Sequence, residues 1–157
     1  MSIWFKPFTL EQIRESFDAK PDLAGHLDIR ITAVGPDFLQ GTMPVDHRTF
    51  QPFGLLHGGA SVALAETLGS VAANYCVDMS RFHCVGQEIN ANHVRSVRAG
   101  RVTGTARPIH VGSRSHVWEI RIEDESGRLC CISRLTMAVL EAPDGGARQQ
   151  KTGSSAQ

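Results

Sequence analysis

The sequence has no excess of charge of either sign. It carries 16 Lys and Arg residues against 16 Asp and Glu residues in 157, and its formal net charge is +0. A nucleic-acid-binding protein or a polybasic membrane-binding protein would show a basic surplus. We therefore expect no nucleic-acid partner and no other polyanionic macromolecule.

Long hydrophobic runs are also missing. No segment approaches the length that spans a bilayer without charges, and the opening MSIWFKPFTLEQ holds no apolar stretch long enough for a signal peptide. We therefore expect no membrane association and a cytoplasmic location.

Cysteine is scarce and lacks the spacing of a metal or disulfide framework. The four residues Cys76, Cys84, Cys130 and Cys131 include no CxxC pair, and adjacent cysteines on a strand point to opposite faces. We expect no metal site, and four small core residues in a reducing compartment.

What the chain does contain is the composition of one globular domain. It is 41% hydrophobic and 20% charged, and its length suits a single core. After residue 141 the tail APDGGARQQKTGSSAQ has almost nothing to bury. We predict a domain over residues 1–141 and a disordered tail over residues 142–157.

The hydrophobic pattern predicts an α+β fold in which an antiparallel sheet wraps one long helix. The long helix, residues 58–76, is apolar on nearly every side and should be buried. One helix covers only one face, so we expect self-association to protect the rest. The other expected elements are a helix over residues 9–18 capped by Thr9, strands over 27–34 and 38–45, a loop over 46–56, and strands over 85–97, 101–110, 115–123 and 128–140, of which the last three form a meander.

Glu66 is the most informative residue, because it lies in the middle of this apolar helix. If its carboxylate is buried, desolvation raises its pKa and makes it a candidate base or nucleophile. The alternative is a thin solvent-exposed stripe that Glu66 shares with Ser61, Thr67 and Ser70. The sequence leaves both interpretations open.

The triplet His57-Gly58-Gly59 marks the start of the same helix. The first N–H groups of a helix have no partner within it, so the Gly58 amide could stabilise an oxyanion that develops on a carbonyl. The alternative is that both glycines only allow tight entry into the helix. Gln51, in the preceding loop, could orient a water or a carbonyl, or could simply be solvated.

The spacing between Gly58 and Glu66 links this hypothesis to an oligomer. Eight positions correspond to about 12 Å along a helix axis, so both groups of one helix cannot touch one reacting carbon. A shared active site therefore requires Glu66 from a second copy, which predicts a homodimer with two composite sites.

Two further clusters carry Arg, Ser and Gly residues, which suit phosphate oxygens. One holds His93, Arg95, Ser96 and Arg98 at a strand end, and the other spans residues 110–115 at a turn. Solvated strand ends are the common alternative for either cluster.

Three segments, QPFGLLHGGASVALAETLGS, VGQEINANHVRS and GTARPIHVGSR, together resemble the hotdog-fold acyl-CoA thioesterases. The similarity covers roughly residues 3–140. It is closest to the branch that contains 1,4-dihydroxy-2-naphthoyl-CoA thioesterases of menaquinone biosynthesis and the proofreading thioesterases of enterobactin synthesis. The resemblance implies the hotdog fold, in agreement with the pattern above.

The resemblance also implies roles for individual residues. Glu66 corresponds to the catalytic carboxylate, on the subunit opposite Gly58, whose amide polarises the thioester carbonyl. His57 and Gln51 correspond to supporting residues, and Ser70 to a polar residue of the acyl pocket. Members of this branch are typically tetramers, built as dimers of dimers. The residues that correspond to segments holding the acyl chain and coenzyme A are Gly86, His93, Val94, Arg95, Ser96, His110, Val111, Gly112, Ser113, Arg114 and Ser115.

The implied reaction is hydrolysis of an acyl-CoA or acyl-carrier-protein thioester, which needs no metal and no redox cofactor. The resemblance favours an aroyl or other bulky acyl group, with medium-chain groups as a further option. No G-x-S-x-G motif is present, which excludes the α/β-hydrolase route. The alternatives are a hotdog hydratase or dehydratase and a non-catalytic acyl-CoA sensor, although Glu66 would only add a desolvation cost in a sensor.

Overall fold

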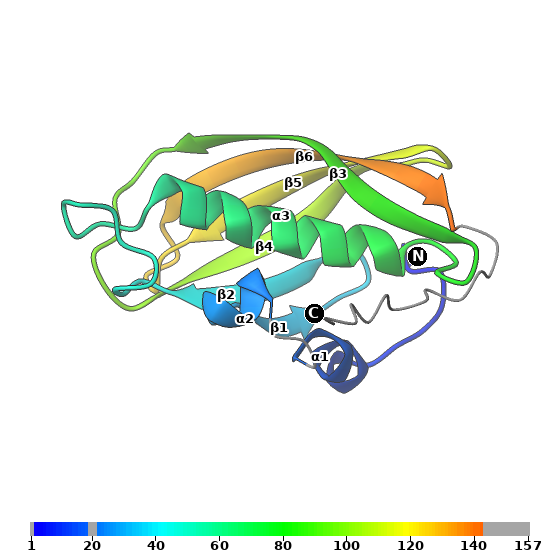
Figure 1. The fold of residues 1–157 in the computed structure, drawn as a ribbon, viewed down its shortest axis with the longest axis horizontal. Coiled ribbons are helices and arrows are strands. Elements are labelled where there is room, and N and C mark those ends of the chain that lie inside the picture. The colour runs from blue at the N-terminus through cyan, green and yellow to red at the C-terminus, as the bar shows by residue number, and fades with distance from the viewer. Residues whose placement is uncertain (1, 19–21, 143–157) are drawn as a thin grey trace, which may run out of the picture.

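A computed structural model describes residues 2–18 and 22–142 of the chain. Figure 1 shows a curved sheet with one long helix along its concave face and two short helices below that helix. In chain order the elements are α1 (Leu10–Asp18), α2 (Leu23–His26), β1 (Arg30–Val34), β2 (Leu39–Pro44), α3 (Gly58–Tyr75), β3 (Phe82–His93), β4 (Arg101–Val111), β5 (Ser115–Glu123) and β6 (Leu129–Glu141).

The sheet has six strands in the order β1-β2-β4-β5-β6-β3, and every neighbouring pair is antiparallel. The first two strands form a hairpin, and the expected meander of the last three is present. This arrangement confirms the predicted α+β fold, with a sheet wrapped around one long helix. None of the helices in the described ranges is long and apolar enough to cross a membrane.

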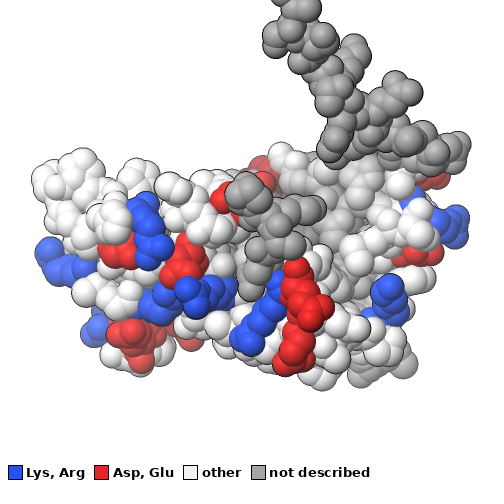
Figure 2. All heavy atoms as spheres, turned by 60° about the horizontal axis from the view of Figure 1, so that its bottom comes forward, with Lys and Arg blue, Asp and Glu red and all other residues white. Residues whose placement is uncertain are grey.

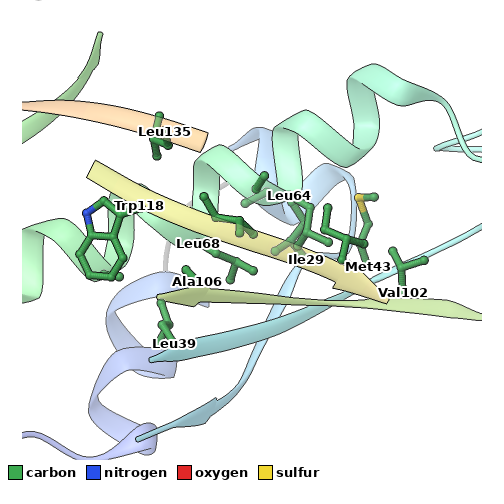
Figure 3. Close-up of a cluster of buried hydrophobic side chains, with 14 of the residues drawn as sticks. Ile29, Leu39, Met43, Leu64, Leu68, Val102, Ala106, Trp118 and Leu135 are labelled. Carbon is green, nitrogen blue, oxygen red and sulfur yellow. The ribbon is translucent and has the colours of Figure 1, made fainter. Parts of the chain in front are cut away.

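A notch between two strands fixes α3 on the sheet. Gly41 of β2 and Gly104 of β4 are register partners, and a Cβ atom on either would lie 2.7 Å from a methyl carbon of Leu68. Leu68 therefore occupies the space that two missing side chains leave open. Figure 3 shows Leu64 and Leu68 directed from α3 into the cluster that contains Ala106, Trp118 and Leu135.

The opposite face of α3 is less buried than the sequence predicts. The fully buried residues of α3 lie on the side of the helix that faces the sheet. On the other side, Glu66 is exposed and Val71 is only half-buried. The description of a helix buried on all sides is therefore wrong for a single chain. An apolar helix with one open side is the surface on which a second copy could pack.

The first helix is capped and packed as expected. The Thr9 hydroxyl accepts a hydrogen bond from the Gln12 amide, and the Gln12 side chain accepts one from the Thr9 amide, which is a reciprocal cap. Ile13 is buried, and Arg14 donates from Nε to the Ile31 carbonyl at 2.9 Å. Helix α1 thereby covers the free edge of β1.

Several boundaries differ from the prediction. The first strand starts at Arg30 rather than at residue 27, because Leu27 is the C-cap of α2, a helix that the sequence did not predict, and Asp28 then turns the chain at a φ of 52°. Strand β3 starts at Phe82, where it still pairs with Glu141, and ends at His93. It stops there because the next two amides, Val94 and Arg95, both donate to the Cys130 carbonyl.

The ends of two other predicted segments also need comment. Helix α3 ends at Tyr75, and Cys76 is its C-cap rather than its last helical residue. The predicted disordered tail lies outside the described residues, apart from Ala142, so the domain boundary at residue 141 stays a prediction.

The surface charge agrees with the balanced composition. On the face that Figure 2 presents, basic and acidic side chains lie side by side, and neither sign forms a broad patch. Asp28, for example, bonds the guanidinium groups of Arg30 at 2.6 Å and Arg101 at 3.1 Å. The Arg30 hydrogen bond is the main reason that the pKa of Asp28 is lowered.

Candidate active site

The amino terminus of α3 presents one free backbone donor. His57 is the N-cap: its carbonyl accepts from the Ala60 and Ser61 amides, and its Nδ1 accepts from the Gly59 amide at 2.8 Å. The Gly58 N–H has no partner in the described part of the chain. The helix therefore leaves available the amide that the sequence indicates as an oxyanion donor.

A cavity of about 380 Å³ lies at this helix end and brings together much of the expected site. The His93 ring crosses Gly58 so closely that a Cβ on Gly58 would lie 2.9 Å from Nε2. Glycine at this position thus lets the imidazole approach the bare backbone. The cavity is lined by Gln51, Leu55, Leu56, Gly58, Ser61, His93, Val94, Arg95, Ser96 and Cys130.

The loop before α3 holds Gln51 at the cavity. The Gln51 amide donates to the Leu55 carbonyl at 2.8 Å, its carbonyl accepts from Gly54 at 2.9 Å, and its Oε1 accepts from the Phe53 amide. Its Nε2 protons have no partner among the residues that the structure describes. Gln51 is therefore fixed by its own loop, with two donors left for a ligand.

Glu66 lies in a different depression, a groove of about 560 Å³ that it shares with Ser70 and Val71. Its carboxylate is exposed in the single chain, so the solvent-facing interpretation holds there. Ser61, which that interpretation places on the same stripe, is instead buried. The Glu66 carboxylate rests against β3, since a Cβ on Gly86 would lie 2.7 Å from Oε1.

A bulge in β3 places Gly86, which lies beside Glu66, and His93, which lies beside Gly58, on the same face of the strand. Gly86 pairs with Met137 and Ile89 with Leu135, so one extra residue lies between Gly86 and Glu88. Side chains alternate with period two, and without the extra residue positions 86 and 93 would face opposite sides. The bulge therefore allows Gly86 to face Glu66 while His93 faces Gly58.

A single chain does not bring the Gly58 amide and the Glu66 carboxylate together. Helix α3 is continuous from Gly58 to Tyr75, and the eight positions between Gly58 and Glu66 span about 12 Å. The free amide and the carboxylate consequently open into separate depressions.

The turn over residues 110–115 lies at the far end of the sheet from Gly58. It is closed by the Gly112 amide, which donates to the Ser115 carbonyl, and it contacts β6 where the Val139 amide donates to Arg114. His93, by contrast, pairs with Cys131 near the start of β6. The two segments that were expected to hold the acyl chain and coenzyme A therefore lie at opposite ends of the sheet within one chain.

The structure draws attention to three residues that the sequence did not indicate as candidates for a functional role: His116, Phe17 and Leu23. His116 is 1% exposed, and burial is the main cause that lowers its pKa below the ordinary 6.5. Phe17 and Leu23, from α1 and α2, line the Glu66 groove. An apolar residue directly after a capping Asp was the available signal for Leu23.

No group of three or more His, Cys, Asp and Glu side chains gathers as a metal site within residues 2–18 and 22–142. Three cysteines are buried and Cys76 is half-buried. Burial raises the pKa of Cys76 to about 12 and that of Cys84 to about 11, which keeps both thiols protonated. The interpretation of the cysteines as packing residues is confirmed.

Comparison with known proteins decides the family. The family model described as thioesterase superfamily matches residues 53–131. A 1,4-dihydroxy-2-naphthoyl-CoA hydrolase of Escherichia coli strain K12 is 56% identical over 138 residues, which is 88% of this chain and 99% of that protein.

The chain belongs to the thioesterase superfamily. The proofreading thioesterase EntH of Cronobacter turicensis is 51% identical over 88% of this chain and 98% of that protein. The crystal structure of a mutant of thioesterase PA1618 from Pseudomonas aeruginosa superposes with a TM-score of 0.86, at 51% identity over 90% of this chain and all of the other. The hotdog-fold enzyme described above is accordingly a thioester hydrolase.

Proposed function

We propose that this thioesterase hydrolyses coenzyme A thioesters of aroyl groups, such as 1,4-dihydroxy-2-naphthoyl or benzoyl, together with medium-chain acyl groups. A relative of 56% identity is named for 1,4-dihydroxy-2-naphthoyl-CoA, which supports the aroyl class. A relative of 51% identity is named a proofreading thioesterase. The family resemblance also implies carrier-protein thioesters, and these are included as test substrates.

The proposed reaction needs one carboxylate and one oxyanion donor. Glu66 either takes a proton from the attacking water or attacks the thioester carbon itself. The carbonyl oxygen, as it becomes an oxyanion, accepts a hydrogen bond from the Gly58 N–H. If Glu66 acts as the base, collapse of the intermediate releases the free acid, and the departing thiolate of coenzyme A takes the proton from Glu66. If Glu66 attacks, collapse releases coenzyme A and leaves a mixed anhydride, which water hydrolyses to the free acid and the Glu66 carboxylate. Gln51 and His57 hold the thioester and the attacking water beside that amide.

The observation that carries the proposal is the separation of the free Gly58 amide from the Glu66 carboxylate on one continuous helix. Because the two lie about 12 Å apart, one reaction centre needs Gly58 of one copy and Glu66 of another. The functional unit is then a homodimer with two composite sites.

The free edge of the sheet is evidence in favour of a second copy. Strand β3 has twelve residues, pairs only with β6 in the described part of the chain, and is exposed along residues 85–88. A long unpaired edge is a template for pairing with another chain. This edge also lies directly beside Glu66, through Gly86.

The first experiment measures thiol release from benzoyl-CoA, a hydroxynaphthoyl-CoA, a medium-chain acyl-CoA, a long-chain acyl-CoA and an aroyl carrier protein. We expect turnover of the aromatic and medium-chain members, and its loss in Glu66→Gln. Glu15→Gln is the matched control, because Glu15 is exposed on α1 and lines neither depression. Absence of turnover for every thioester by folded protein would favour a lyase or a sensor.

A second experiment tests the composite site. Glu66→Gln and Gln51→Ala copies are unfolded together and refolded as a mixture. Each mixed dimer then holds one site with both changes and one intact site, so activity rises above that of either variant alone, up to about a quarter of the wild-type rate. A site contained in one chain gives no such recovery.

A further inference from the structure

The groove that contains Glu66 runs between α3 and the two N-terminal helices. It has a volume of about 560 Å³, within the usual range of small-molecule sites. Helix α2 lies directly beside α3 (Figure 1). Glu66 and Ser70 lie at one end, and beyond them the walls are mainly apolar, formed by Ile13, Phe17, Leu23, Ala24, Val71 and Tyr75.

The groove contains Ser70, which the family resemblance assigns to the acyl pocket. We propose that α1 and α2 form the outer wall of this pocket, and that Phe17 and Leu23 determine which acyl groups fit. The proposal rests on the proposed function, because it takes Glu66 as the reacting carboxylate. It gives the N-terminal helices a role in specificity beyond packing.

The position of the groove favours an acyl group as the occupant. The acyl group begins at the carbonyl carbon that Glu66, or the water it activates, attacks, so the acyl pocket must start beside that carboxylate. The cavity at Gly58 also has apolar walls, but it adds Arg95 and Ser96, whose side chains suit the polar thiol side of coenzyme A. The groove, by contrast, has no basic side chain among the described residues that line it.

The length of the groove indicates a bulky group. Glu66 and Tyr75 are nine positions apart on α3, which corresponds to about 13 Å. An extended medium-chain acyl group would cover most of this apolar wall, and a bicyclic aroyl group would cover the part nearest Glu66. An acetyl group would leave it wet and gain little binding free energy from it.

The far end of the groove is rigid and its outer rim is open. The Tyr75 ring packs on Phe8 with centroids 4.4 Å apart, and Ile13 is only 1% exposed. Leu23, on the rim, is 63% exposed, although the cap from Asp22 to the Gly25 amide holds its helix in place. An acyl chain lying against Leu23 would remove this apolar side chain from water.

The test is Leu23→Trp, which fills the groove from its exposed rim without altering the core. We expect kcat/KM for hydroxynaphthoyl-CoA and decanoyl-CoA to fall about tenfold or more, with acetyl-CoA unchanged. Leu140→Trp is the matched control, because Leu140 is an exposed leucine at the end of β6, outside the groove. Leu23→Ala should shift the same ratio by a few-fold.

A ratio of bulky to acetyl substrates that stays unchanged in both Leu23 variants, in an enzyme that Glu66→Gln inactivates, overturns this inference and leaves the proposed function standing. Loss of the dimer in Leu23→Trp, seen by sedimentation, would also overturn it, because the groove would then be a protein interface. A wild-type chain that hydrolyses no thioester refutes the proposed function itself. Titration with 1-hydroxy-2-naphthoate supplies a binding readout, which Leu23→Trp should weaken and Leu140→Trp should not.

Discussion

Gly86 faces the Glu66 carboxylate from β3, and a methyl group at this position has no room. The Cβ of alanine would lie 2.7 Å from Oε1, whereas ordinary contacts begin at 3.4 Å. The carboxylate of Gly86→Ala must therefore retreat by roughly 0.7 Å or more, away from the strand. The atom that moves is the end of an exposed, flexible side chain, so the fold has no reason to change.

Catalysis is far more sensitive than stability to such a shift. A misplacement of about 1 Å can reduce a rate about a hundredfold. We expect kcat of Gly86→Ala to fall about tenfold to a hundredfold, with the unfolding free energy changed by less than about 1 kcal/mol. Substrate binding should change less than kcat, because the acyl pocket and the Gly58 amide stay in place.

The assay is steady-state thiol release, with urea unfolding on the same samples. Val85→Ala is the control, because Val85 is the adjacent residue of β3 and alternation places its side chain on the opposite face of the strand. A wild-type kcat in Gly86→Ala would refute the reasoning that Gly86 provides space for Glu66. A raised KM at unchanged kcat would instead make Gly86 a contact of the substrate.

Three further predictions follow from the packing. Gly58→Ala should lower kcat because the new Cβ would lie 2.9 Å from Nε2 of His93. In a double-mutant cycle, kcat of the Gly58→Ala and His93→Ala double variant should fall by less than the two single reductions combined. Leu68→Ala should destabilise the fold by about 2–5 kcal/mol in urea, since it empties the notch that a fully buried side chain fills. Burial lowers the pKa of His116 below 6.5, so as the pH falls through this value the unfolded chain binds a proton before the folded chain does, and the unfolding free energy falls. His116→Phe should reduce this loss of stability between about pH 7 and 5.5. An unchanged dependence of the unfolding free energy on pH would contradict the argument.

The sequence predicted those features that depend on local chemistry. Helix α3 follows from its composition and from the cap at His57, and the meander follows from alternating strands separated by glycine turns. The proposal of a second copy also comes from the sequence, because the distance between Gly58 and Glu66 is set by the rise of a helix.

Contacts between distant segments were decided only by the tertiary structure. The bulge after Gly86, which turns His93 toward α3, results from the register of β3 against β6, and no local pattern encodes this register. The exposure of Glu66, the approach of Gly86 to its carboxylate and the role of Leu23 as a groove wall likewise depend on which surfaces meet. The chain's local chemistry determines its helices and strands, whereas side chains far apart in sequence meet only after the sheet has closed around α3.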